Sequence, residues 1–349
     1  MAINLELPKK LHTTIDQAHQ AAAEIFRPVS RKYDLAEHAY PVELDTLASL
    51  YDGLAETGQA GAGADGGRSQ AAKKKPKAEG EVVNGGNMQS VLNVMETSWG
   101  DVGLMLSMPY QGLGNSAIAA VATDEQLKRF GKVWAAMAIT EPGFGSDSAA
   151  VTTTATLDGD EYVINGHKIW TSYSDIADWC LLLARTDPDV PRHRGISAFI
   201  VPMDTPGIVQ RPLKMISGIT TEFGQVTFDD VRVPAGNIVG QPGDGWAMAM
   251  TVVGHEREPS TLGYVARYAK TVQSLVSRAD EPNDELALAA VETEMLRLHV
   301  RRRLSEQLDG VSHSSEGSLD KLLMTWTEQT VGHAAIGGEK ILRPLHDHT

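Results

Sequence analysis

The sequence predicts an α+β multidomain fold with an N-terminal helical domain, a middle β-barrel or sandwich domain and a C-terminal helical bundle. Apolar residues recur every three or four positions up to about residue 130, as on one face of a helix. Short β-branched stretches follow between 136 and 235, and the helical period returns from residue 245. The length of 349 residues allows several subdomains around a substantial core. We place the domains at 1–135, 136–238 and 239–349 and expect the last to be incomplete.

The first domain is predicted to be helical, with a long loop inside it. Pro28 and Pro41 mark interruptions or first-turn positions. Residues 58–87 are rich in Gly, Ala, Gln and Asp, which predicts a flexible, exposed loop before helical spacing resumes over 88–130. The basic run 73–77 is expected to be solvated, with attraction of an acidic ligand or partner as the minority alternative. The apolar positions of the first two helices are Leu11, Ile15, Ala18, Ala22, Ile25, Phe26, Leu44, Leu47, Leu50, Tyr51 and Leu54.

The middle region is predicted to consist of short strands. Residues 151–157 alternate β-branched side chains, and a turn at 158–160 leads into a second strand, so the two form a hairpin. Apolar runs at 179–184 and 196–201 indicate buried strands. Two further stretches at 226–228 and 231–234 complete the set. Several short strands between turn signals favour a small barrel or sandwich.

The last region returns to helices. Met248, Val252 and the apolar residues that follow them recur at helical spacing up to Val276. A long helix is expected from Asp284 to about Leu308, and another is expected to begin near Ser318.

Composition excludes several classes of protein. The formal net charge of −14 argues against a nucleic-acid surface, which needs clustered Lys and Arg. The single cysteine, Cys180, rules out an intrachain disulfide and fits a reducing compartment, with a small buried apolar residue as its expected role. The N-terminus lacks the features of a signal peptide, and no stretch reaches the ~18 apolar residues of a membrane span. We therefore expect a cytoplasmic protein.

Two segments about twenty residues apart indicate a site for a large, flat, anionic cofactor. Residues 139–147 read Ile-Thr-Glu-Pro-Gly-Phe-Gly-Ser-Asp, in which Gly143 and Gly145 permit close backbone approach. Residues 165–172 read Asn-Gly-His-Lys-Ile-Trp-Thr-Ser and offer an aromatic plane followed by two hydroxyls. The alternative interpretation of the first segment is a capped turn between a helix and a strand. Trp170 alone would be interpreted as an ordinary core aromatic.

At these residues the chain resembles an acyl-CoA dehydrogenase. The stretches Phe-Asp-Asp-Val-Arg-Val-Pro at 228–234 and Gly-Asp-Gly-Trp at 243–246 add to the likeness, in matching order and spacing. The resemblance covers roughly 10–335 and is sharpest from 134 to 260. It implies the three-domain fold of that family, FAD as cofactor, a thioester substrate and usually a tetramer.

The resemblance also implies residues for the flavin. Thr140 would lie beside the pyrimidine side of the ring, together with backbone groups of Met137 and Ile139. Ser146 would lie near the pyrophosphate and the CoA part of the substrate.

The second segment would complete the cofactor site. Trp170 would lie against one face of the isoalloxazine and exclude water from it. Thr171 would also contact the cofactor, and Ser172 would donate to N5, the atom that receives the hydride. Many relatives carry Thr at the position of Ser172, so the hydroxyl is kept.

Glu256 is the candidate catalytic base. A carboxylate in a desolvated pocket has a raised pKa and can take the α-proton of a thioester. A subset of the family places its base at such a Glu-Arg pair, at the start of a helix, and Arg257 matches the arginine, a candidate for substrate binding. The alternative is a surface ion pair at a helix start, formed by Glu256, Arg257 and Glu258. His333, His346 and His348 do not form a convincing metal set, so no metal is expected.

The predicted function is FAD-dependent α,β-dehydrogenation of an acyl-CoA, with hydride transfer to flavin N5 and electrons passed to an electron-transfer flavoprotein. The chain departs from the family after residue 336, where a Tyr-Glu-Gly-Thr-like segment is absent, and at 278–284, where an Arg-Gln-Phe-Gly-like stretch is absent. In the family these pieces hold the ADP half of FAD in a neighbouring subunit. A non-catalytic or half-site subunit of a heteromeric acyl-CoA dehydrogenase is therefore the alternative to a homo-oligomeric enzyme. Truncation of the chain would give the same pattern.

Overall fold

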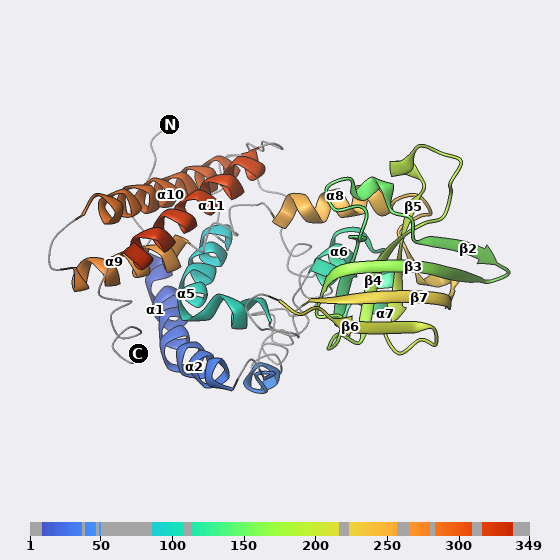
Figure 1. Ribbon diagram of the computed structural model, residues 1–349, viewed down its shortest axis with the longest axis horizontal. Helices are drawn as coiled ribbons and strands as arrows, with labels where there is room; N and C mark the ends of the chain where they lie inside the picture. The colour runs from blue at the N-terminus through green and yellow to red at the C-terminus, as the bar shows by residue number, and fades with distance from the viewer. Residues whose placement is uncertain are drawn as a thin grey trace, which may run out of the picture. The chain divides into compact units, whose positions relative to one another are not determined.

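The computed structural model describes residues 9–36, 39–46, 49, 86–107, 113–215, 223–256, 265–279, 283–308 and 316–337. They fall into two compact units, each assembled from segments far apart in the sequence (Figure 1). The helical unit draws on Met1–Lys32, Lys77–Met105 and Gly254–Thr349, and the sheet unit on Tyr33–Pro76 and Leu106–Val253.

In the helical unit, the N-terminal segment is a nearly continuous helix. α1 (Lys9–Ala21) passes through a π-helical turn, η1 (Ala22–Phe26), into α2 (Arg27–Leu35). Pro28 lies in the first turn of α2, directly after the π-helical turn. α5 (Gly86–Leu106) consists of two helical segments joined at Asp101, whose backbone is extended (φ −168°, ψ 119°) and whose Oδ1 accepts the N–H of Leu104 at 2.8 Å.

The C-terminal helices of this unit pack on one another. They are α9 (Val265–Arg278), α10 (Asp284–Leu308) and α11 (Glu316–Gly337). Their shared core contains the buried side chains of Tyr268, Leu296 and Val331. α10 has the bounds that the sequence predicts, and α11 begins two residues before the predicted start.

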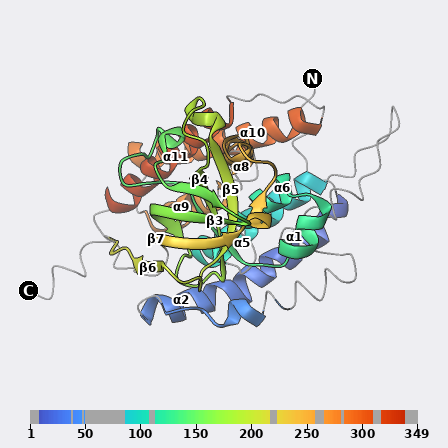
Figure 2. The ribbon, with the colours of Figure 1, turned by 90° about the vertical axis from the view of Figure 1, so that its right-hand side faces the viewer.

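The sheet unit is built on one mixed eight-stranded sheet. Its order is β6-β7-β3-β2-β4-β5-β8, and β1 pairs with β4 outside this path. β4 runs parallel to β1 and β2 and antiparallel to β5. Figure 2 looks onto this unit and shows β7 running alongside β3. The strands are β1 (Ala135–Ala138), β2 (Thr154–Asp158), β3 (Glu161–Ser172), β4 (Trp179–Arg185), β5 (Ile196–Pro202), β6 (Ile208–Pro212), β7 (Phe223–Pro234) and β8 (Ile238–Val239).

Strands β4 and β5 are buried on both faces. One face, with Leu181 and Ile200, packs against residues of α6 (Leu113–Val121), α7 (Asp124–Phe130) and α8 (Gly245–Glu256). The other face, with Leu182 and Phe199, packs against Ile164 and residues of β7. This two-sided burial explains why both strands are mostly apolar. Short 3-10 helices connect the strands: η2 (Ser148–Ala150), η3 (Arg192–Arg194) and η4 (Ala235–Asn237).

The predicted fold class is confirmed, since helical regions accompany a central mixed sheet. The hairpin of β2 and β3 turns at Gly159 (φ 67°), as the sequence indicates. Cys180 is a free, buried thiol. The sequence pattern misses β1, which is Ala-Ala-Met-Ala without β-branched residues, and also β6 and the two-residue β8.

Several predictions fall on parts of the chain that the structure does not describe. The predicted loop at 58–87 lies almost wholly outside the described residues, and so do the basic run 73–77, His346 and His348. The division into three successive domains stays a prediction. Within the described residues, no helix is long and apolar enough to cross a membrane.

Candidate functional site

The two predicted motif segments lie side by side in the sheet unit. The N–H of Ile169 in β3 donates to the carbonyl of Thr140, just after β1, at 2.9 Å. Glu141 and Phe144 exchange backbone hydrogen bonds of 3.4 and 3.0 Å and close the turn between them. The fold thus joins the hydroxyl- and glycine-bearing segment to the aromatic segment, as the sequence predicts for a shared site.

Trp170 stands out from the sheet on a backbone irregularity. The pairing of β3 with β7 shifts register between Lys168 and Thr171. Within this bulge Trp170 has φ 60°, a left-handed conformation that costs a bulky L-residue about 1–3 kcal/mol. Its side chain is 51% exposed and meets Phe223 edge-on, with ring centroids 6.1 Å apart. The ordinary core aromatic considered from the sequence is therefore the wrong interpretation, because half of the indole faces outward.

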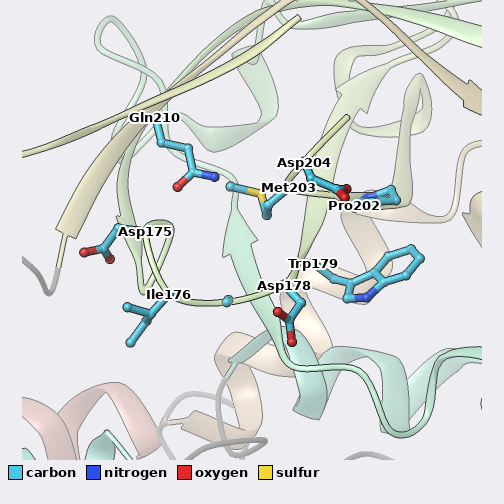
Figure 3. Close-up of a pocket in the computed structure, with 9 residues that line it drawn as sticks. Asp175, Ile176, Asp178, Trp179, Pro202, Met203, Asp204 and Gln210 are labelled. Carbon is cyan, nitrogen blue, oxygen red and sulfur yellow. The ribbon is translucent and has the colours of Figure 1, made fainter. Parts of the chain in front are cut away.

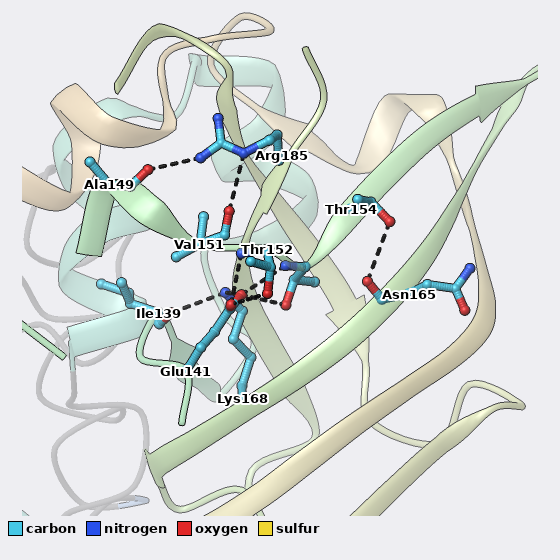
Figure 4. Close-up of polar contacts among 10 residues, drawn as sticks. Ile139, Glu141, Ala149, Val151, Thr152, Thr154, Asn165, Lys168 and Arg185 are labelled. Atoms are coloured by element: carbon cyan, nitrogen blue, oxygen red, sulfur yellow. Dashed lines mark hydrogen bonds and ion pairs between the residues drawn. The ribbon is translucent and has the colours of Figure 1, made fainter. Parts of the chain in front are cut away.

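A buried ion pair lies behind the paired segments (Figure 4). Lys168 and Glu141 have side chains 0% and 3% exposed, and Lys168 Nζ lies 2.9 Å from Glu141 Oε1. Nζ also donates to the carbonyl of Ile139 at 3.0 Å. The Glu141 carboxylate accepts four more hydrogen bonds, from the N–H and hydroxyl groups of Thr152 and Thr153, at 2.6–2.9 Å.

The pKa values of the pair reflect this environment. Burial raises the pKa of Glu141, but Lys168 and the threonine donors outweigh it and bring the pKa down to about 2. Burial lowers the pKa of Lys168 to about 8, although Glu141 favours its charged form. The 2.9 Å contact between Lys168 Nζ and Glu141 Oε1 favours the charged form of both groups.

This network is not among the predicted site residues, although the sequence contains one signal for it in β3. Lys168 follows Ile164 by four residues in a strand, so both side chains point to the same, buried face. A lysine at an inward position requires a buried partner, which the Glu141 of the first segment supplies.

The loop that carries Ser146 is exposed, and its C-terminal end is held by hydrogen bonds from β4. Ser146 itself is exposed. Arg185 in β4 donates to the carbonyls of Ala149 at 2.8 Å and Val151 at 3.1 Å, which fixes the C-terminal end of the loop (Figure 4).

The glycines of the two segments differ in whether packing requires them. A Cβ added at Gly143 or Gly145 would meet no atom within 4 Å, and neither residue has a positive φ. The packing of the chain therefore does not require glycine there, which leaves room for a ligand to approach the backbone. A Cβ at Gly166, by contrast, would lie 2.3 Å from Thr153 Oγ1, so Gly166 is needed for packing.

The remaining predicted cofactor residues lie around this position. Met137 is half-buried in β1, opposite Leu181 of β4. Thr171 is fully buried, and among the described residues its hydroxyl has no hydrogen-bond partner. Ser172 is half-buried at the end of β3, opposite Phe223.

The predicted base occupies a different helical position from the one expected. Glu256 is the last described residue of α8, which begins at Gly245, so it does not lie at the start of a helix. The side chain of Glu256 is not described, and Arg257 and Glu258 lie outside the described residues. Their roles stay predictions.

An acidic hollow lies elsewhere in the sheet unit, between the end of β3 and the end of β5 (Figure 3). It has a volume of about 420 Å³ and contains none of the predicted site residues. Burial raises the pKa of Asp175 at its edge. Its lining residues are Asp175, Ile176, Ala177, Asp178, Trp179, Pro202, Met203, Asp204 and Gln210.

Comparison with known proteins agrees with the motifs and the fold. Residues 136–231 match the profile of the acyl-CoA dehydrogenase middle domain. Acyl-CoA dehydrogenase IpdE1 of Mycobacterium tuberculosis is 38% identical over 232 residues, which cover 63% of this chain and 60% of that protein. Acyl-CoA dehydrogenase FadE34 of the same organism is 42% identical over 147 residues, or 40% of this chain and 20% of that protein. The chain thus spans about three fifths of the length of IpdE1.

Solved structures show the fold. A glutaryl-coenzyme A dehydrogenase in complex with glutaryl-CoA has a TM-score of 0.76 at 21% identity, covering 97% of this chain and 86% of that one. The Tcur3481-Tcur3483 steroid ACAD has a TM-score of 0.75 at 23% identity, covering 96% and 85%. The fold and the paired segments define an acyl-CoA dehydrogenase-like architecture. Over residues 136–231 the chain matches the middle domain of the acyl-CoA dehydrogenase family.

Proposed function

We propose that this chain carries out the FAD-dependent α,β-dehydrogenation of an acyl-CoA thioester and passes the electrons to an electron-transfer flavoprotein. The observation that carries the proposal is the direct pairing of Thr140 with Ile169, beside the exposed indole of Trp170. The relatives named as acyl-CoA dehydrogenases support the reaction class.

The residues present fit FAD. Trp170 offers a half-exposed aromatic face for a flat ring, on a strained backbone of the kind that clusters at functional sites. Gly143 and Gly145 leave the neighbouring backbone open to an anionic ligand. The buried hydroxyl of Thr171 has no partner among the described residues, so it has hydrogen-bonding capacity to spare.

In this proposal the chain positions both reactants. Thr140 and the backbone groups of Met137 and Ile139 hold the pyrimidine side of the ring, and Ser172 donates to N5. FAD, when bound, supplies the acceptor for the hydride from the β-carbon of the substrate.

Further residues act on the thioester itself. Glu256 takes the α-proton, and Arg257 and Ser146 contact the substrate. A carboxylate suits the first task because desolvation raises its pKa and makes it a stronger base.

The test is a visible spectrum of the purified protein. We expect the absorption band of oxidised flavin and its bleaching on addition of an acyl-CoA. Glu256→Gln should retain the band and lose the bleaching, and Glu258→Gln, two residues away, is the matched control and should bleach normally. A protein that binds no flavin, alone or with a co-expressed homologue, would contradict the proposal. Normal bleaching in Glu256→Gln would remove only the assignment of the base.

A second proposal concerns assembly, as a homo-oligomer or with a second acyl-CoA dehydrogenase-like subunit. Its support is a row of exposed apolar side chains on α10 at three- and four-residue spacing: Leu288 (52%), Val291 (57%), Met295 (62%) and Leu298 (37%). Such a row along one helix face is typical of a surface that another chain covers.

Light scattering after size exclusion tests the assembly. Met295→Glu should lower the measured mass of the assembly. Leu157→Glu, which changes a 56% exposed residue of β2 in the same way, should leave the mass unchanged. A wild-type mass of one chain, with or without a co-expressed homologue, would contradict the proposed oligomer. A flavin band that appears only with the homologue would favour the half-site subunit.

A further inference from the structure

Lys168 makes contacts that the proposed reaction does not use. Its side chain is fully buried, and its ammonium joins two groups of the first motif, the carbonyl of Ile139 at 3.0 Å and the carboxylate of Glu141 at 2.9 Å. Glu141 already accepts four hydrogen bonds from Thr152 and Thr153. The lysine is therefore not required to satisfy the hydrogen bonds of that carboxylate, and its distinctive contact is with Ile139.

Net stability does not account for such a pair. Two buried charges lose most of their Coulombic attraction to desolvation, and apolar residues of similar volume often serve equally well. A buried ion pair is better explained by the geometry that it imposes on its neighbours. Here the neighbour is the peptide group between Ile139 and Thr140.

That peptide group connects the ion pair to the proposed cofactor face. The carbonyl of Ile139 and the N–H of Thr140 belong to one amide, and a cation at the carbonyl polarises the amide and strengthens its N–H as a donor. Among the described residues, the N–H of Thr140 donates to no partner. The carbonyl of Thr140 is in turn bonded to Ile169, next to Trp170. The Lys168 ammonium thus binds the carbonyl side of this amide and leaves the N–H of Thr140 available to a ligand.

We propose that Lys168, held by Glu141, is a positioning residue that fixes and polarises the Ile139–Thr140 amide against the pyrimidine side of the flavin. This inference rests on the proposed function, because it assigns the amide to a bound FAD. Loss of the ammonium should weaken FAD binding and lower the reduction potential of the bound flavin, since electron density that enters the ring is less well stabilised.

The experiment compares Lys168→Met, the double variant Glu141→Gln/Lys168→Met and wild type. The double variant removes both buried charges and guards against a single variant that fails to fold. We expect FAD affinity about tenfold lower and a two-electron potential about 30 mV lower, which is a tenfold change in the redox equilibrium. Arg232→Met, which removes one positive charge from an exposed site on β7, is the matched control and should change neither quantity.

A second readout uses the protein without FAD. Hydrogen exchange at the amide of Ile169, which donates to the carbonyl of Thr140, should be about tenfold faster in the double variant, while amides at 161–164 of the same strand keep their rates. Unchanged exchange would overturn the positioning role. Wild-type potential and affinity in a folded double variant would overturn the polarising role. If wild type binds no FAD, alone or with a partner subunit, the proposed function fails, and the exchange rates still decide whether Lys168 fixes the amide.

Discussion

Glu141→Gln is the sharpest test of how the site is held together. The substitution keeps the shape of the side chain and removes its charge. Glu141 is 3% exposed and accepts five hydrogen bonds, four from Thr152 and Thr153 and one from Lys168. A glutamine offers one oxygen in place of two, so at least one threonine donor or the ammonium loses its acceptor.

The expected cost follows from the pKa of the carboxyl. A fall from the ordinary value of 4.5 to about 2 corresponds to about 3 kcal/mol of stabilisation at neutral pH, since one pKa unit is worth about 1.4 kcal/mol. Removing one member of a buried ion pair typically costs about 3–5 kcal/mol, because the other charge stays buried. Both routes give a loss of about 3 kcal/mol in the free energy of unfolding of the sheet unit.

The stabilisation by the Glu141 carboxylate also depends on pH, and it decreases in acid. The folded protein binds the Glu141 proton less tightly than the unfolded chain does, so this stabilisation is complete above pH 4.5. It is lost as the pH falls from 4.5 through about 2. The Glu141→Gln variant lacks this contribution and should show a correspondingly weaker acid dependence in that window.

The assay is native-state hydrogen exchange of the β3 amides, which reports on the sheet unit directly, with urea unfolding as a second measurement. Glu161→Gln is the matched control: this acid lies on the same strand, is 39% exposed and pairs with Arg232, so its loss should cost about 0–1 kcal/mol. The reasoning is refuted if Glu141→Gln costs no more than Glu161→Gln. It is also refuted if the acid dependence of the two variants is the same.

Three further perturbations test separate parts of the argument. Trp170→Gly relieves the left-handed strain (φ 60°), so thermal unfolding should show a gain of about 1 kcal/mol in the free energy of unfolding. The FAD affinity of this variant should fall, and unchanged affinity in a flavin titration would argue against a contact with the ring. Gly114→Ala puts a Cβ 2.2 Å from the carbonyl oxygen of Ala135, so we expect a loss of about 1–3 kcal/mol in urea unfolding, and a smaller effect would mean that α6 can shift. Asp320→Asn, 1% exposed and 3.2 Å from Arg303 Nε, should destabilise the helical unit by about 3 kcal/mol in calorimetry, and a change below 1 kcal/mol would show that Glu306, 3.2 Å from Arg303 Nη1, compensates the charge of Arg303.

The sequence is informative where local pattern and burial agree. β4 and β5 are mostly apolar because both faces are covered, and α10 begins and ends at the predicted residues. β1 escapes prediction because its alanines carry little strand preference and its pairing with β4 is non-local. Such strands form because they pair with distant segments, and a local sequence pattern does not reveal that pairing.

The same distinction applies to the site. The residue types of the motifs identify the paired segments, but neither the bulge at Trp170 nor the hydrogen bond from Ile169 to Thr140 can be read from them. The role of Glu141 is hidden for another reason. In the sequence it is one letter of a turn-like motif, and only the fold brings Lys168 and the two threonines to it. Glu256 shows the limit of analogy, since the resemblance indicates a helix start, whereas α8 already begins at Gly245.

The strained tryptophan and the buried ion pair are best understood together. A bulky residue at positive φ persists only where its surroundings over-determine it, at a cost of about 1–3 kcal/mol. The two residues before Trp170 are both bonded to the first motif. Lys168 bonds to Glu141 and Ile139. Ile169 bonds to Thr140. The ion pair and the Ile169 hydrogen bond thus fix the backbone just before the bulge, so Glu141→Gln should release Trp170 from its outward position before the sheet itself unfolds.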